Sequence, residues 1–278
     1  MPTLSQFLFG AIVLGALAAV PGIALAPWWR ARRRRALAGR PFPAAWRRVL
    51  ARQVPIVGRL PAPLQRELER RMQVFIAEKP FVGCRGLVVT EAMRVVVAAQ
   101  ACLLLLGRPH WHHAGLRQVL LYPGAFLVDR VHAEPGGVRR GERQALAGES
   151  WSQGQVVLSW DDVLAGAADP ADGRNVVLHE FAHQLDQADG RSNGAPPLPR
   201  GMDGRRWARV LQQAFDALRA QLGRGEAAPL DPYAATSPAE FFAVATEAFF
   251  EQGPRMAAAQ PALYAELAAF YGVDPASW

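Results

Sequence analysis

The sequence predicts an α+β fold that is mainly helical, with a small mixed sheet and a hydrophobic helix ahead of the folded domain. Three observations support this prediction. Apolar residues recur at helical spacing through much of the chain, short β-rich segments lie near its middle, and the first 29 residues hold no ionisable side chain. The 278 residues are 51% hydrophobic and 20% charged, which is enough material for one well-buried core.

The uncharged run from Met1 to Trp29 is long enough to cross a bilayer core, which takes roughly 20 helical residues. Eight arginines follow it, at positions 30, 32, 33, 34, 35, 40, 47 and 48. Because basic residues favour the cytoplasmic side, we expect residues 1–29 to be a single anchor in the cytoplasmic membrane, with the following domain in the cytoplasm. Residues 30–48 would form a basic juxtamembrane linker and residues 49–278 the domain. A cleaved signal peptide and a soluble arm on a cytoplasmic protein are the alternatives.

The charge distribution argues against direct binding of nucleic acid. The eight arginines lie within residues 1–50, which contain no Asp or Glu, so they account for the whole net charge of +7. The remaining chain is close to neutral and offers no basic footprint of its own. The two cysteines, Cys84 and Cys102, are too few for a disulfide framework or a metal cluster, which fits a reducing compartment.

The elements of the domain follow from local patterns. Residues 61–81 carry apolar side chains at three-to-four spacing and predict an amphipathic helix. Residues 91–107 predict a second, buried helix, too short in its apolar part to span a membrane. Residues 118–130 predict two strands separated by Pro-Gly, and residues 155–160 predict another, which we expect to pair as an edge with an extended peptide. Helices return from about Asn175.

The stretch HEFAH at residues 179–183 predicts a metal site. On a helix, His179 and His183 lie one turn apart on the same face, so both imidazoles reach one ion. Glu180 is rotated by about 100° and can address a water bound to that ion. This is the arrangement of metal-assisted hydrolysis, and it predicts one Zn²⁺ per chain. A catalytic zinc takes three protein ligands, so a third must come from elsewhere.

No histidine follows His183, so we expect the third ligand to be a carboxylate of the segment SPAEFFAVATEAFFE. Glu240 is a candidate, although it also fits a capping box after a serine and a proline. Glu247 lies seven residues later on the same face and fits either the ligand or an acceptor that supports a ligand imidazole. Glu251 lies near the helix end and looks like a solvated terminus. Spacing alone leaves Glu240 and Glu247 both open.

Four stretches resemble the Mlc titration factor A family of zinc-dependent peptidases. These are LYPGAFLVD, SWSQGQVVLSWDDV, LHEFAHQLDQADG and DPYAATSPAEFFAVATEAFF, and the similarity runs from about residue 45 to the C-terminus. The resemblance implies a zincin-like metallopeptidase domain in which the glutamate of PAE, here Glu240, is the third ligand. The family in turn resembles the metallopeptidase domain of anthrax lethal factor, in which a tyrosine seven residues before that glutamate faces the metal. Tyr233 holds this position.

The motif and the resemblance together predict hydrolysis of peptide bonds by a metal-activated water. The zinc ligands would be His179, His183 and Glu240. Glu180 would act as general base and Tyr233 would steady the oxyanion. Asp186 lies on the histidine face of the helix, and we expect it to orient a ligand imidazole.

The partners that we expect are a peptide or protein substrate, the membrane and a transcriptional repressor. Through such a repressor the peptidase would regulate sugar uptake. The alternative that the family name implies is a non-catalytic regulatory protein that binds and sequesters a repressor of the Mlc type. A second histidine cluster, PHWHH at residues 109–113, is expected to be a solvated turn.

Overall fold

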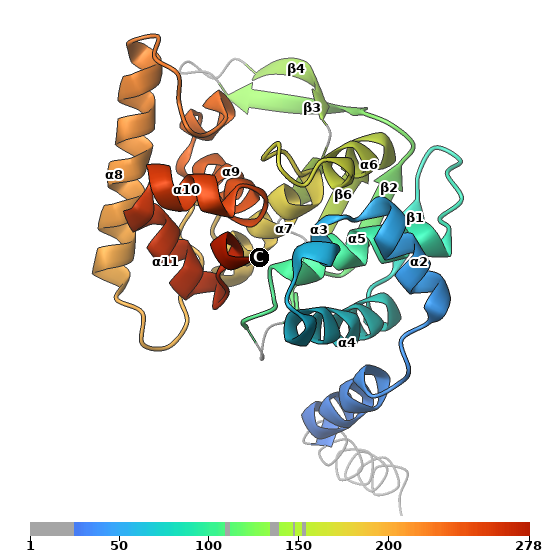
Figure 1. The fold of residues 1–278 in the computed structure, drawn as a ribbon. Helices are drawn as coiled ribbons and strands as arrows, with labels where there is room; N and C mark the ends of the chain where they lie inside the picture. The colour runs from blue at the N-terminus through green and yellow to red at the C-terminus, as the bar shows by residue number, and fades with distance from the viewer. Residues whose placement is uncertain (1–24, 109–111, 134–138, 147, 152–153) are drawn as a thin grey trace, which may run out of the picture. The chain divides into compact units, whose positions relative to one another are not determined.

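The computed structural model describes residues 25–108, 112–133, 139–146, 148–151 and 154–278 of the chain. The chain divides into two compact units, Met1–Pro41 and Phe42–Trp278. The second unit contains the sheet and the candidate site, and its elements are labelled in Figure 1.

In the first unit, residues 25–38 are helical. The exposed rings of Trp28 and Trp29 pack edge to face with 4.9 Å between their centroids, and the Arg32 guanidinium lies 5.6 Å from the Trp28 ring. The predicted anchor over residues 1–29 falls mostly on residues 1–24, which lie outside the described residues. Among the helices that the structure describes, none combines the length and the apolar character that a bilayer crossing needs.

The second unit begins with four helices. They are α2 (Ala44–Gln53), α3 (Ile56–Arg59), α4 (Ala62–Glu78) and α5 (Glu91–Leu103). This compact unit starts at Phe42, ahead of the boundary expected at residue 49, and Phe42 already packs into the core. The prediction of a buried helix is confirmed for α5, which the Thr90 side chain caps and whose residues from Val95 onward are buried.

The sheet is mixed, as the sequence predicted. Its strands are β1 (Phe81–Gly83), β2 (Gln118–Tyr122), β6 (Gln155–Ser159) and β5 (Gly148–Trp151), in the spatial order β1-β2-β6-β5. The first three are parallel, and β5 runs antiparallel to β6. A separate antiparallel pair consists of β3 (Phe126–Ala133) and β4 (Arg139–Leu146).

The expectation that residues 155–160 form an edge strand is wrong. β6 has β2 on one side and β5 on the other, so its backbone already pairs on both sides. The reason is visible in its composition, since Val156, Val157 and Leu158 are all buried, and a continuous apolar run is typical of a central strand. The outer strand on this side of the sheet is β5.

Six further helices complete the unit. They are α6 (Trp160–Ala168), α7 (Val176–Asp186), α8 (Gly204–Gly223), α9 (Pro238–Glu251), α10 (Gly253–Ala259) and α11 (Pro261–Tyr271). Helix α7 lies in the middle of the unit, against α5 on one side and α9 on the other (Figure 1). The structure is thus mainly helical with a small sheet, which confirms the α+β prediction. Short 3₁₀ turns occur at Gln187–Asp189 (η1), Pro232–Ala235 (η2) and Pro275–Ser277 (η3).

Candidate metal centre

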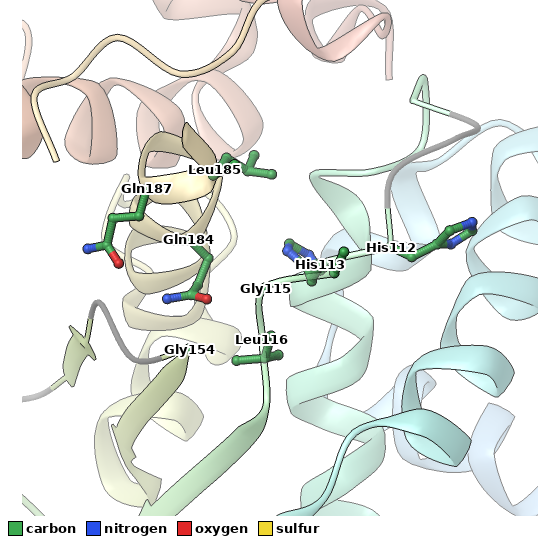
Figure 2. Close-up of a pocket in the computed structure, with 10 residues that line it drawn as sticks. His112, His113, Gly115, Leu116, Gly154, Gln184, Leu185 and Gln187 are labelled. Carbon is green, nitrogen blue, oxygen red and sulfur yellow. The ribbon is translucent and has the colours of Figure 1, made fainter. Parts of the chain in front are cut away.

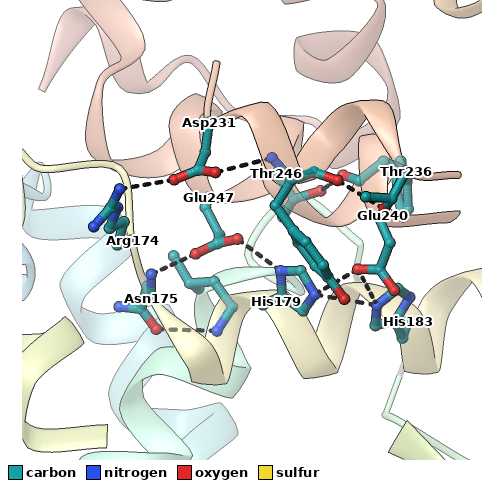
Figure 3. A network of polar contacts seen from close by, with 12 residues as sticks. Arg174, Asn175, His179, His183, Asp231, Thr236, Glu240, Thr246 and Glu247 are labelled. Atoms are coloured by element: carbon teal, nitrogen blue, oxygen red, sulfur yellow. Dashed lines mark hydrogen bonds and ion pairs between the residues drawn. The ribbon is translucent and has the colours of Figure 1, made fainter. Parts of the chain in front are cut away.

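Helix α7 begins at an asparagine cap. The Asn175 side-chain oxygen accepts the Leu178 N–H at 3.0 Å, which satisfies one of the free donors of the first turn. Apolar residues then face the core, among them Leu178 and Phe181, which are fully buried. The remaining face, which carries His179 and His183, is turned toward α9 (Figure 3).

Helix α9 begins at a serine cap. The Glu240 backbone N–H donates to the Ser237 hydroxyl at 3.2 Å, and Pro238 occupies the first helical position. The backbone of Glu240 therefore takes part in the cap. Its carboxylate takes no part in that cap and points toward α7.

Three potential ligand atoms meet between the two helices. The Nε2 atoms of His179 and His183 are 3.2 Å apart, and Glu240 Oε2 lies 3.0 Å from the first and 3.4 Å from the second (Figure 3). An ion held tetrahedrally at about 2.0–2.1 Å from each ligand atom separates those atoms by roughly 3.3–3.4 Å. The two imidazoles and the carboxylate therefore fit a tetrahedral divalent metal. Each of these three residues offers one potential ligand atom, and all three atoms lie within 4.8 Å of one another.

Glu247 supports His179 from the opposite side. Its Oε1 lies 2.7 Å from His179 Nδ1, on the far side of the ring from Glu240. A carboxylate at Nδ1 fixes that nitrogen as a donor and directs Nε2 to the site, which is the usual arrangement behind a metal-bound histidine. The two glutamates that spacing could not distinguish thus lie at different nitrogens of one imidazole.

Glu251 is not a solvated terminus, contrary to the expectation from its position. It is only 4% exposed, and its Oε1 accepts from Asn175 Nδ2 at 2.9 Å. Burial raises its pKa to about 8. The C-terminal turn η3 packs closely beside the end of α9, since a Cβ on Gly253, two residues after Glu251, would lie 2.8 Å from the backbone nitrogen of Ala276.

Asp186 has a different partner from the one predicted. It is completely buried, and its Oδ2 accepts the Gly194 N–H at 2.8 Å. Within the described part of the chain, neither His179 nor His183 is hydrogen-bonded to it. Burial raises its pKa, an effect that the backbone N–H groups of the loop and the nearby His183 partly offset. The carboxylate turns to this loop because backbone donors are available there.

Glu180 lies beside the trio with a free proton-accepting atom. It is 5% exposed, and its buried Oε2 has no hydrogen-bond partner among the described residues. Burial raises its pKa to about 7, against the lowering effect of His179 and His183. A carboxylate that titrates near neutrality is suited to accept and return a proton.

Tyr233 lies over the site from the loop ahead of α9. Its ring centroid is 6.1 Å from that of His179, the rings are inclined by 35°, and the side chain is 44% exposed. The backbone of η2 is fixed by Asp231, whose Oδ1 accepts the Tyr233 N–H at 2.9 Å, and by the Thr236 hydroxyl, which donates to the Tyr233 carbonyl at 2.8 Å. The tyrosine therefore lies near His179 on a turn fixed by hydrogen bonds, and its side chain is exposed to solvent.

The charges of the trio are strongly coupled. Burial lowers the pKa of His179, but the hydrogen bonds to Glu240 and Glu247 outweigh it and hold that pKa well above 6.5. Burial likewise raises the pKa of Glu240, yet His179 and His183 bring it well below its ordinary value. The Glu240 carboxylate therefore stays ionised. Its negative charge and the acidic neighbours of His179 favour a cation between the ligand atoms.

The structure describes two histidines of the second cluster, His112 and His113. His110 lies outside the described residues. His113 is buried, contrary to the predicted solvated turn; its Nε2 lies 3.1 Å from the Ala101 carbonyl, and burial lowers its pKa to about 3. It lines a pocket of about 340 Å³ at the C-terminal end of α7, together with Leu116, Gln184 and Gln187 (Figure 2). Its neutral ring packs at 4.9 Å from that of Phe181.

Comparisons with known proteins identify the relatives of this chain. The model of the family described as glucose-regulated metallo-peptidase M90 matches residues 28–272. An uncharacterized protein of Synechocystis is 38% identical over 265 residues, which cover 95% of each chain. Mlc titration factor A of Klebsiella pneumoniae is 36% identical over 234 residues, 83% of this chain and 86% of that protein. Mlc titration factor A of Cronobacter sakazakii is 34% identical over 251 residues, 89% and 91% respectively.

Replacement of Glu251 by Gln should change how stability depends on pH. The folded-state pKa of about 8 exceeds the ordinary 4.5, so the folded protein binds more protons between these values. Wild type should therefore lose stability as pH rises from about 5 to 8, by a few kcal/mol at roughly 1.4 kcal/mol for each pKa unit. Urea unfolding at pH 5, 6.5 and 8 measures this loss, and Glu251→Gln should remove the share that Glu251 contributes, so that the stability of the variant falls less steeply with pH. Parallel curves for the two proteins would contradict the burial argument.

Proposed function

The chain belongs to the glucose-regulated metallo-peptidase M90 family, and from this premise we propose that it is a zinc-dependent metallopeptidase that hydrolyses peptide bonds. The observation that carries the proposal is the meeting of His179, His183 and Glu240 at spacings that suit a tetrahedral ion. These three residues would hold the metal. A bound zinc ion polarises a carbonyl oxygen and lowers the pKa of water.

Glu180 would move the proton in this reaction. Its unpartnered Oε2 can take a proton from the attacking water as the water oxygen adds to the peptide carbonyl carbon. The same oxygen then returns that proton to the amide nitrogen as the C–N bond breaks, so the amine leaves neutral. A carboxyl with a pKa of about 7 can perform both transfers near neutral pH.

Tyr233 and Glu247, which both lie next to His179, would assist the reaction. The exposed phenol of Tyr233 can donate a hydrogen bond where negative charge develops on the carbonyl oxygen. Glu247 holds the imidazole through Nδ1 and so keeps the Nε2 lone pair directed at the site.

Two conservative substitutions test the proposal. Purified wild type should contain about one zinc per chain. Glu180→Gln should keep the metal but lose hydrolysis by at least about 100-fold, because the amide cannot accept the proton. Glu240→Gln should lose most of the metal, because the carboxylate is replaced by a weak neutral ligand. Metal analysis and cleavage of a peptide library measure both effects.

The matched control is Glu226→Gln, which makes the same chemical change at an exposed residue paired with Arg224. It should retain both zinc and activity. Wild type without zinc, or Glu180→Gln with full activity, would refute the peptidase proposal.

We propose β5 as the strand to which an extended substrate adds. It is the outer strand of the sheet on this side and packs against α7, which carries the histidines. A peptide that pairs with β5 would extend the sheet past the metal ligands, with main-chain hydrogen bonds at every second residue.

Backbone N-methylation of a cleaved peptide tests this pairing. Methyl groups at alternate amides should lower kcat/KM about tenfold or more, since each removes one ladder hydrogen bond, whereas the intervening amides should tolerate methylation. Equal tolerance at every position would exclude strand addition.

Regulation of a repressor is the second candidate function. Relatives at 34–36% identity are named Mlc titration factor A. Sequestration of a repressor of the Mlc type needs a binding surface but no chemistry, so Glu180→Gln would bind such a repressor as tightly as wild type. If the repressor is cleaved by wild type and not by Glu180→Gln, the repressor is instead a substrate. Its cleavage would link the peptidase to sugar uptake. Co-purification with both proteins, followed by mass spectrometry, distinguishes the two cases.

We also propose that the N-terminal run attaches the protein to the cytoplasmic membrane, with the catalytic domain in the cytoplasm. The support comes from sequence alone, namely the uncharged run Met1–Trp29 and the arginines after it. In its source cells the full chain should stay with membranes after an alkaline carbonate wash, while a variant that lacks residues 1–29 should be released. Recovery of the full chain in the soluble fraction would refute this attachment.

A further inference from the structure

We propose that Asn175 is a positioning residue that sets α7 against α9 and thereby brings the two histidines and Glu240 to the spacing that a metal requires. The inference rests on the proposed metal site but concerns a residue outside the ligand set. Three different atoms of Asn175 make hydrogen bonds, and two of them reach α9, one at Glu247 and one at Glu251. Figure 3 shows the bond to Glu247.

The contacts of Asn175 serve two separate purposes. Its Oδ1 accepts the Leu178 N–H and caps α7. Its backbone N–H donates to Glu247 Oε2 at 2.5 Å, and its Nδ2 donates to Glu251 Oε1 at 2.9 Å. A second acceptor for Nδ2, the Gly166 carbonyl at 3.3 Å, connects the same side chain to α6. A cap alone would need only the first of these contacts.

The two acceptors on α9 are one turn apart. Glu247 and Glu251 stand on the same face of the helix, both buried, with Asn175 between their carboxylates. Glu240 lies two turns before Glu247 on this face, so a shift of α9 along or about its axis at Asn175 moves Glu240 as well. Because Glu247 also holds His179 Nδ1, the contact to Asn175 links the position of a ligand imidazole to that of the carboxylate ligand.

The alternative is that Asn175 acts only as a helix cap. Asn175→Ser distinguishes the two, because serine caps helices about as well as asparagine but cannot reach Glu251 with a donor. Glu251→Leu removes the same contact from the other side and leaves the cap intact. Glu251→Gln is the conservative control, since its side-chain carbonyl still accepts from Nδ2. Asp203→Ala controls for a lost cap on α8, a helix without candidate ligands.

The experiment measures zinc affinity by competition with a chelator and the visible absorption of the Co²⁺-substituted protein. It also measures the thermal midpoint of the metal-free protein. Asn175→Ser and Glu251→Leu should each lower zinc affinity by roughly 10–100-fold and shift the Co²⁺ bands, the range typical of changes behind metal ligands. Glu251→Gln should remain within about twofold of wild type. Asp203→Ala should lower the thermal midpoint while its affinity and spectrum stay unchanged.

Wild-type affinity and an unchanged Co²⁺ spectrum in Asn175→Ser would overturn the inference while the proposed function stands. If Asn175→Ser fails to fold, Glu251→Leu decides by the same criteria. Wild type that binds neither zinc nor Co²⁺ would refute the proposed function itself.

Discussion

The packing of α7 against α9 is the contact on which the candidate metal centre depends. The two histidines lie on the first helix, and Glu240 lies on the second, 61 residues after His179. Metal coordination tolerates errors of only a few tenths of an ångström in ligand position. No local sequence preference supplies that accuracy across two helices. It must come from side chains that hold the helices at a fixed distance and rotation.

Those side chains are polar, although the surroundings are apolar. Phe241, Phe242, Phe249 and Phe250 are all buried on the other faces of α9. A carboxylate buried among such residues is strongly destabilising unless hydrogen bonds replace the lost water. Glu247 has two hydrogen bonds of this kind, to a histidine and to a backbone N–H. The phenylalanines pack against rings of α8, α11 and the C-terminus and hold α9 in the core, while the polar contacts fix the position of α9 against α7.

Glu180 differs from Glu247 in this respect, and Asp186 and Glu251 each also keep one buried carboxylate oxygen without a hydrogen-bond partner among the described residues. Glu247 is satisfied, whereas the buried Oε2 of Glu180 has no partner in the part of the chain that the structure describes. An unsatisfied carboxylate raises the free energy of the folded state, and stability alone would favour a hydrophobic residue there. The same burial that destabilises the ionised carboxylate raises the pKa of Glu180 to about 7. A group held in this condition beside three potential ligands is better explained by chemistry than by folding.

The parts of the site that the sequence predicted are those set by local geometry. The four-residue spacing in HEFAH places two imidazoles on one helical face wherever the helix lies, and Ser-Pro-Ala-Glu marks a helix start by its capping chemistry. Burial of Glu251 was missed because the glycine and proline after it suggested a surface turn, whereas segments distant in the sequence, Asn175 ahead of α7 and the turn η3 beside Gly253, pack at this end of α9. Asn175 offered a signal, an asparagine directly before an apolar run, but that signal indicates a cap and says nothing of α9. The sequence likewise could not predict that β5 is the outer strand, because strand order depends on pairing between segments that are distant in the sequence.

Asp186 also shows how a local pattern fixes the face of a helix while distant segments decide the hydrogen-bond partner. Spacing placed it correctly on the histidine face, yet an acid at a helix C-terminus opposes the helix dipole and needs donors of its own. The loop after α7 provides them, and it lies so close to α9 that a Cβ on Gly194, which has φ +73°, would come within 2.2 Å of the Pro238 carbonyl oxygen. The carboxylate thus joins the end of α7 to the start of α9, as Asn175 joins the start of α7 to the end of α9. With a contact at each end, the ligands between them have little freedom to separate.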